Sequence, residues 1–132
     1  MGRILVVGDI HGSAKALEQV LERSNFNPKV DKFISIGDVA DGWSEVSECV
    51  DILLEIKSKS GEENEPVFIR GNHDVWMYDY MMYGQTPSLW TTQGGKATLD
   101  SYVRTGKLED GHHKDFWFKQ QEQVRVISPD YV

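Results

Sequence analysis

The chain repeats one pattern three times within its first 74 residues: a short apolar run, a glycine, and a cluster of polar residues. The apolar runs are RILVV at residues 3–7, DKFISIG at 31–37 and PVFIRG at 66–71. A continuous apolar run is typical of a strand that is buried on both faces of a parallel sheet. We therefore predict a buried strand at each of the three positions.

Apolar residues at helical spacing separate these strands. After the first strand Ser13 is a suitable N-cap, and apolar side chains recur at positions 14, 17, 20 and 21. A second stripe follows Ser44 and ends near Gly61, with apolar side chains at positions 46, 49, 50, 53 and 54. Strands that alternate with helices predict an α/β fold with a largely parallel or mixed central sheet flanked by helices.

The pattern changes after residue 75. A stretch rich in Trp, Tyr and Met leads to a predicted helix at about 96–103, and Gly94 and Gly95 are expected to break the helix before it. Basic residues are not interleaved with these aromatic ones. We therefore assign the aromatic residues to packing rather than to a surface that stacks nucleic-acid bases.

The last part of the chain predicts one more helix and one more strand. HKDFWFKQQ at 113–121 predicts a helix in which Phe116 and either Trp117 or Phe118 face inward. VRVI at 124–127 predicts the start of a strand that the end of the chain interrupts.

Composition narrows the class of protein. The chain has 132 residues, and we assign residues 1–132 to a single small domain. Lys and Arg number 14 against 21 Asp and Glu, a net charge of −7, which disfavours non-specific binding to nucleic acid or to an anionic membrane surface. Cys49 is the only cysteine. Since no apolar run has the length of a signal peptide or of a membrane span, we predict a cytoplasmic protein.

A polar cluster follows each predicted strand. The clusters read GDIHG at 8–12, GDVADGW at 37–43 and GNHD at 71–74. Because the carboxyl ends of parallel strands lie along one edge of a sheet, we expect the clusters to converge there. Asp, Asn, His and Gly are also ordinary turn residues, and that simpler interpretation suits any one cluster alone. Three clusters in order, each directly after a strand, favour a site.

Four side chains in these clusters are suitable metal ligands, namely Asp9, His11, Asp38 and Asn72. Hard oxygen ligands with one imidazole suit Mn, Fe or Zn better than Ca or a thiolate-bound structural metal. Asp38 stands alone after its strand and is the best candidate to bridge two ions. Two ions about 3.5–4 Å apart polarise a phosphoryl group and generate hydroxide at neutral pH, which is the chemistry of phosphoester hydrolysis.

The three clusters resemble the first three signature blocks of the calcineurin-like metallophosphoesterases, which read roughly GDxHG, GDxxDRG and GNH[DE]. WTTQGGKATLDSY at 90–102 and HKDFW at 113–117 are similar to the middle of bacterial and phage enzymes related to serine/threonine protein phosphatases. The resemblance covers essentially the whole chain. It implies a metallophosphoesterase-like sandwich that is incomplete at its C-terminus.

The resemblance also implies a role for each candidate ligand. Asp9 and His11 would hold the first metal, Asp38 would bridge the two metals, and Asn72 would bind the second.

Three further residues are implied near the leaving group and the phosphate. His73 would be the general acid at the leaving-group oxygen, oriented by Asp41, with Asp74 as the other candidate partner. An imidazolium held by a carboxylate is well suited to protonating an alkoxide. Arg70 is a weaker candidate for contact with the phosphate.

Two features depart from the family pattern. Where the protein phosphatases have arginine after the second Asp, this chain has Gly42 followed by Trp43, so a bidentate phosphate clamp is missing and phosphoprotein specificity does not carry over. The family also has two later histidines for the second metal, and neither block occurs here. His112 and His113 precede a predicted helix, which favours a solvated helix start over metal ligation. The chain is therefore either the N-terminal part of a longer protein or a natural truncation with a weakened site.

These features predict a metal-dependent phosphoesterase, with manganese favoured, that hydrolyses phosphomonoesters, or phosphodiesters, with a metal-bound hydroxide. The alternative is a catalytically weak or inactive module that binds a metal or a partner and derives from such an enzyme. The expected partner is a phosphorylated substrate, with no nucleic acid and no membrane. Self-association or a complementing C-terminal segment would cover hydrophobic surface that this chain leaves open.

Overall fold

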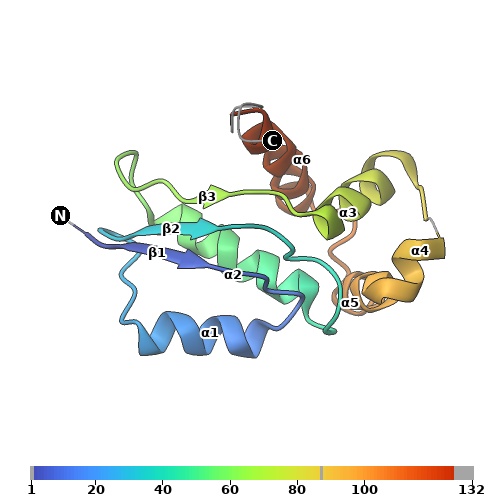
Figure 1. Ribbon diagram of the computed structural model, residues 1–132, viewed down its shortest axis with the longest axis horizontal. Coiled ribbons are helices and arrows are strands. Elements are labelled where there is room, and N and C mark those ends of the chain that lie inside the picture. Colours follow the sequence, from blue (N-terminus) through green and yellow to red (C-terminus); the bar gives the residue numbers. More distant parts are fainter. Residues whose placement is uncertain (1, 87, 127–132) are drawn as a thin grey trace.

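The computed structural model describes residues 2–86 and 88–126, which form a parallel sheet with helices packed beside it (Figure 1). The strands, in their spatial order, are β1 (Ile4–Val7), β2 (Lys32–Ser35) and β3 (Val67–Phe68). Both neighbouring pairs are parallel, and Ile34 of β2 lies opposite Val67 of β3. The predicted strands and the parallel sheet are confirmed, and the three carboxyl ends lie along one edge.

Helices connect and flank the strands. They are α1 (Ala14–Arg23), α2 (Val46–Lys59), α3 (Asn72–Tyr83), α4 (Ser88–Trp90), the π-helical turn η1 (Thr91–Gly95), α5 (Lys96–Thr105) and α6 (Gly111–Val126). The helices predicted after the first two strands and near 96–103 are all present. Figure 1 shows α1 and α2 running alongside the strands; these two helices contact each other, and α6 contacts α2, α3 and β3. None of the helices in the described part of the chain has the length and apolar composition to cross a membrane.

The hydrophobic core lies between the sheet and α2. Its completely buried side chains there are Phe33, Val46, Cys49, Val50 and Leu53. Burying one such apolar side chain contributes about 1.5–3 kcal/mol, so the apolar stripe of α2 holds this helix on the sheet. Met77, Trp90 and Trp117 are also completely buried, as predicted for the aromatic and Met-rich stretches, whereas Met82 and Tyr83 at the end of α3 are 38% and 67% exposed and depart from that prediction.

The opposite face of the sheet is exposed, so the prediction that the first strand is buried on both sides is wrong. Ile4, Val6 and Ile36 are 65%, 56% and 49% exposed, and we call these three residues the open sheet face. Successive side chains of a strand point to opposite faces of the sheet. Since α1 and α2 pack side by side on one face, the alternate residues on the other face stay uncovered by the described helices.

Two predictions in the C-terminal part are also wrong. Residues 124–126 continue α6 instead of starting a strand, and residue 127 lies outside the described residues. A helix satisfies its backbone N–H and C=O groups within the segment, whereas a strand needs a partner strand. In the same helix Phe116 and Trp117 are buried and Phe118 is 44% exposed, which decides between the two inward alternatives.

Gly94 and Gly95 do not break the helix, because η1 contains both and runs directly into α5. Gly94 has a φ of +101°, which side chains rarely adopt, so glycine permits a wide turn without ending the helical segment.

Candidate metal centre

The first two polar loops are joined by backbone hydrogen bonds at the carboxyl edge of the sheet. The amide of His11 donates to the carbonyl of Asp38 over 2.8 Å. The amide of Gly12 donates to the carbonyl of Val39 over 2.9 Å, and that of Trp43 donates back to the carbonyl of His11 over 2.8 Å. The predicted convergence of these two clusters is confirmed, because β1 and β2 are neighbours that end side by side.

One buried carboxylate, that of Asp74, fastens the third loop to the second. Asp74 is completely buried in the first turn of α3. It accepts hydrogen bonds over 2.8 to 3.0 Å from four backbone amides, those of Asp38, Val39, Ala40 and Gly71. Burial raises the pKa of Asp74 to about 6, although the backbone donors oppose that shift. Asp74 therefore organises the loops and is not the carboxylate that holds His73.

Asp9, His11 and Asp38 bring their ligand atoms together. One such atom of each residue lies within 4.8 Å of the others. Nδ1 of His11 lies 3.0 Å from the carbonyl oxygen of Ala40, and it carries the proton because a carbonyl only accepts. The lone pair therefore stays on Nε2, which lies 3.5 Å from Oδ2 of Asp9. Histidine ligands are commonly oriented in this way, so three of the four predicted ligands are placed as a candidate site for a divalent metal.

Three residues of this site have left-handed backbone conformations. The φ angles of His11, Asp38 and Asp41 are +47°, +54° and +73°. Asn25 is the one other residue besides glycine with a positive φ in the described ranges. Such conformations cost on the order of 1–2 kcal/mol each and concentrate at functional sites. Tight turns after the strands thus bring these side chains together at a local cost in stability.

His73 lies beside the ligand cluster and is held by Asp41. Its amide donates to Oδ1 of Asp38 over 3.1 Å, and its ring centroid is 4.9 Å from that of His11. Nδ1 of His73 lies 2.8 Å from Oδ2 of the completely buried Asp41. Of the two carboxylates that the sequence left open as partners of His73, the structure selects Asp41. Asp41 therefore engages Nδ1, one of the two ring nitrogens of His73.

Asn72 and Arg70 lie next to the same cluster. Asn72 is the exposed first residue of α3, and Arg70 is half-buried in the loop after β3. Between them, Gly71 packs so closely on Asp38 that a Cβ at this position would collide with the Asp38 carboxylate. The start of α3 is thereby held against the second loop. Metal binding by Asn72 and phosphate contact by Arg70 stay predictions.

Two residues that sequence reasoning missed also contact Asp41. The indole Nε1 of Trp90 donates to Oδ1 and Oδ2 over 2.9 and 2.8 Å. The hydroxyl of Thr98 donates to Oδ1 over 2.5 Å. A buried carboxylate needs donors. No signal in the sequence indicates that they come from residues 49 and 57 positions further along the chain.

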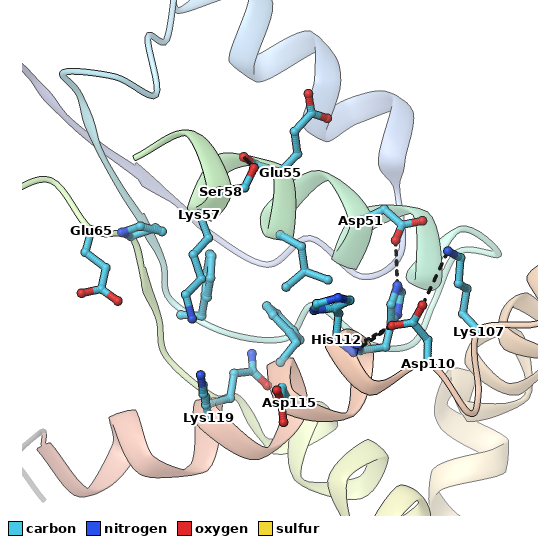
Figure 2. Close-up of a pocket in the computed structure, with 16 residues that line it drawn as sticks. Asp51, Glu55, Lys57, Ser58, Glu65, Lys107, Asp110, His112, Asp115 and Lys119 are labelled. Carbon is cyan, nitrogen blue, oxygen red and sulfur yellow. Dashed lines mark hydrogen bonds and ion pairs between the residues drawn. The ribbon is translucent and has the colours of Figure 1, made fainter. Parts of the chain in front are cut away.

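The prediction of a solvated helix start is wrong for His113 and holds for the exposed His112. His113 is 1% exposed, because α6 packs on α2. Its Nε2 lies 2.7 Å from Oδ1 of Asp51, and its Nδ1 lies 2.7 Å from the hydroxyl of Tyr102. Figure 2 shows Asp51 and His112 at the wall of a cavity of about 890 Å³. That cavity is lined mainly by α2 and α6 and by none of the predicted metal ligands.

The fold and this cluster define an α/β protein with a candidate metal centre at the carboxyl edge of a parallel sheet. Comparison with known families gives a match to the calcineurin-like phosphoesterases over residues 2–128. The chain therefore belongs to the calcineurin-like phosphoesterase family, which is a family of hydrolases of the metallophosphoesterase type.

Relatives with assigned names fall into two groups. Serine/threonine-protein phosphatase 2 of Escherichia coli (strain K12) is 33% identical over 99 residues, which are 74% of this chain and 40% of that protein. The symmetrical bis(5'-nucleosyl)-tetraphosphatase of Pseudomonas putida (strain F1) is 33% identical over 123 residues, which are 93% of this chain and 38% of that protein. The chain thus spans about 40% of the length of the relatives that it matches.

Solved structures agree on the fold. A metallophosphoesterase from Sphaerobacter thermophilus superposes with a TM-score of 0.52 at 24% identity, over 90% of this chain and 40% of the other. A structure described as a putative diadenosine tetraphosphatase gives the same TM-score of 0.52 at 22% identity. At these identities the likeness supports the architecture alone.

Proposed function

We propose that this chain carries the site of a metal-dependent phosphoesterase that hydrolyses phosphomonoesters. The observation that carries the proposal is that two sets of residues meet. These sets are the ligand cluster of Asp9, His11 and Asp38 and the pair formed by His73 and Asp41, and the two histidine rings are 4.9 Å apart. Bound divalent ions supply Lewis acidity and lower the pKa of water at such a site.

Each ligand has a proposed role. Asp9 and His11 would hold one ion, Asp38 would bridge, and Asn72 would bind a second ion at the start of α3. We propose Mn²⁺ because the set combines several oxygen ligands with one imidazole.

His73 would protonate the leaving-group oxygen through Nε2, since Asp41 occupies its Nδ1. Arg70 would contact the phosphate. Gly42 stands at the position where the protein phosphatases have arginine, and neither Gly42 nor the following Trp43, which is 68% exposed, supplies a positive charge there.

A second candidate function is a metal-binding module without turnover. The number of candidate ligands favours it. The described residues contain one group of three His, Cys, Asp or Glu side chains suitable for a metal, which is enough for one ion. This candidate predicts one tightly bound ion per chain. The phosphatase candidate predicts two.

Hydrolysis by the metal-stripped chain, measured with and without added Mn²⁺, decides between these functions. We expect turnover of p-nitrophenyl phosphate that requires Mn²⁺ and two ions per chain by isothermal titration calorimetry. His112→Asn, outside the site, serves as the control and should behave as the unmodified chain does. One bound ion without turnover in a folded chain would support the binding module. Faster hydrolysis of a symmetrical dinucleoside tetraphosphate than of the monoester would contradict the proposed substrate class.

We also propose that further polypeptide, a complementing segment, covers the open sheet face formed by Ile4, Val6 and Ile36. Exposed apolar surface of this kind drives association, so the isolated chain should self-associate. Sedimentation over a concentration series should show this association weakened in Val6→Lys. It should be unchanged in Val103→Lys, which replaces a valine that is 77% exposed on α5. Equal behaviour of both variants would contradict the proposed role of this face.

The remaining proposals concern partners and location. We propose a phosphorylated substrate as the partner and no binding to nucleic acid or membrane, which the net charge of −7 supports. A cytoplasmic location is supported by Cys49, which has no second cysteine to pair with. Burial raises the pKa of the Cys49 thiol to about 12 and keeps it unreactive. Fractionation of cells that express the chain tests the location.

A further inference from the structure

The carboxylate of Asp41 is surrounded by hydrogen-bond donors. Trp90 Nε1 spans both oxygens, the Thr98 hydroxyl donates to Oδ1, and His73 Nδ1 contacts Oδ2. The Thr98 hydroxyl also accepts the backbone amide of Asp41 over 2.8 Å, so its single proton is directed to the carboxylate. Asp41, Trp90 and Thr98 are all completely buried.

This arrangement fixes the direction of two hydrogen bonds. An indole N–H can only donate, and the Thr98 hydroxyl accepts the amide of Asp41, so its proton is directed to the carboxylate. Asp41 therefore accepts from both Trp90 and Thr98. His73 then donates from Nδ1 and keeps Nε2 for the reaction.

The segment from Trp90 to Thr98 is shaped to reach Asp41. It contains the π-helical turn η1, a conformation that occurs frequently at functional sites. Gly94 lies so close to the turn after Asp41 that a Cβ on it would come within 2.6 Å of the Gly42 amide nitrogen. The indole of Trp90 is also packed against the ring of Tyr80, with centroids 5.7 Å apart. The close approach of Gly94 to Gly42 and the packing of Trp90 on Tyr80 keep the indole N–H and the Thr98 hydroxyl directed at the Asp41 carboxylate.

We propose that Trp90 and Thr98 are positioning residues for proton transfer, because together they orient Asp41 and so hold the ring of His73 with Nδ1 protonated and Nε2 available. This inference rests on the proposed phosphoesterase function and adds two residues to its machinery. If Trp90 and Thr98 served packing alone, the shapes of their side chains would matter, but the indole N–H and the threonine hydroxyl would not.

The first test uses the metal-free chain and does not depend on turnover. Long-range ¹H–¹⁵N NMR of the His73 ring should show the Nδ1–H tautomer in the unmodified chain. Thr98→Val keeps the shape of the side chain and removes its donor, and Trp90→Phe keeps an aromatic ring and removes the indole N–H. Both should shift the His73 ring toward a mixture of tautomers. Thr98→Ser should restore the Nδ1–H form. The controls Trp117→Phe, a buried indole bonded to Tyr102, and Thr92→Val, an exposed threonine in η1, should leave the ring unchanged.

The second test compares leaving groups. Protonation matters more for phenyl phosphate than for p-nitrophenyl phosphate, because the phenolate is the more basic leaving group. We expect Trp90→Phe to lower kcat by about 10-fold on p-nitrophenyl phosphate and by about 100-fold on phenyl phosphate, the larger loss being at the lower end of the range that general acids contribute. His73→Asn should show the same preference, and KM should change little.

The outcomes separate this inference from the proposed function. A tautomer shift in Trp90→Phe together with leaving-group dependence supports both. The same tautomer shift in chains that never turn over supports the positioning role and contradicts the phosphoesterase. An unchanged His73 tautomer in a folded Trp90→Phe chain overturns the positioning role, as does an equal loss of kcat on both substrates.

Discussion

Replacing Asp38 by asparagine is expected to abolish Mn²⁺-dependent hydrolysis and to weaken Mn²⁺ binding by at least about 100-fold. Asp38 is the residue on which all three loops converge. Its carbonyl accepts the amide of His11, its own amide donates to Asp74, and its carboxylate accepts the amide of His73. The substitution removes the charge that would bridge two ions. Kinetics on p-nitrophenyl phosphate and calorimetric titration with Mn²⁺ measure the two effects.

This substitution should leave the fold intact. Asparagine has the size of aspartate, keeps one side-chain oxygen, and tolerates the positive φ of +54° at position 38. Asp100→Asn, an exposed change on α5 with a side chain that is 62% accessible, is the matched control and should keep full activity. Unchanged turnover in a folded Asp38→Asn chain would contradict the assignment of the metal centre.

Replacing Asp74 by alanine is expected to cost roughly 4 kcal/mol or more of the free energy of unfolding. The Asp74 side chain satisfies four backbone amides and also accepts from Nε2 of Gln120 on α6 over 3.1 Å. Its removal leaves these donors without partners in a site that excludes water, and each buried unpaired donor costs about 1–3 kcal/mol. Urea denaturation with linear extrapolation measures the loss.

The same change should also weaken metal binding, because the loop that presents Asp38 loses its anchor to α3. Asp79→Ala, further along α3 at a half-exposed position, is the control and should change stability by less than about 1 kcal/mol. A loss below about 1 kcal/mol in Asp74→Ala would show that water replaces the carboxylate and that Asp74 is not the joint between the loops.

Rules that involve only neighbouring residues in the sequence were sufficient to predict the strands and the polar residues that follow them. A buried strand needs apolar residues, and a turn that leaves the sheet needs glycine or a short polar residue, so the positions of Asp9, His11 and Asp38 follow from the pattern of the chain. Parallel pairing then places the strand ends on one edge, and the structure brings these three side chains within 4.8 Å of one another.

Other predictions failed where a neighbour distant in the sequence decided the outcome. Hydrophobic periodicity cannot show that α1 and α2 share one face of the sheet. The prediction that the first strand is buried on both faces was therefore wrong for Ile4 and Val6, which are exposed. His113 looked like a solvated residue at a helix start, yet contact between α6 and α2 buries it.

The sequence alone therefore determined the α/β class, the parallel strands and the candidate metal ligands at the strand ends, because these depend on residues within a few positions of one another. Tertiary structure decided how the site is held. Asp74 reaches the amides of the second loop across 34 to 36 positions, and Trp90 and Thr98 reach Asp41 across 49 and 57. Buried polar groups must find partners wherever the chain places them, and these partners exist only once the strands and helices have packed.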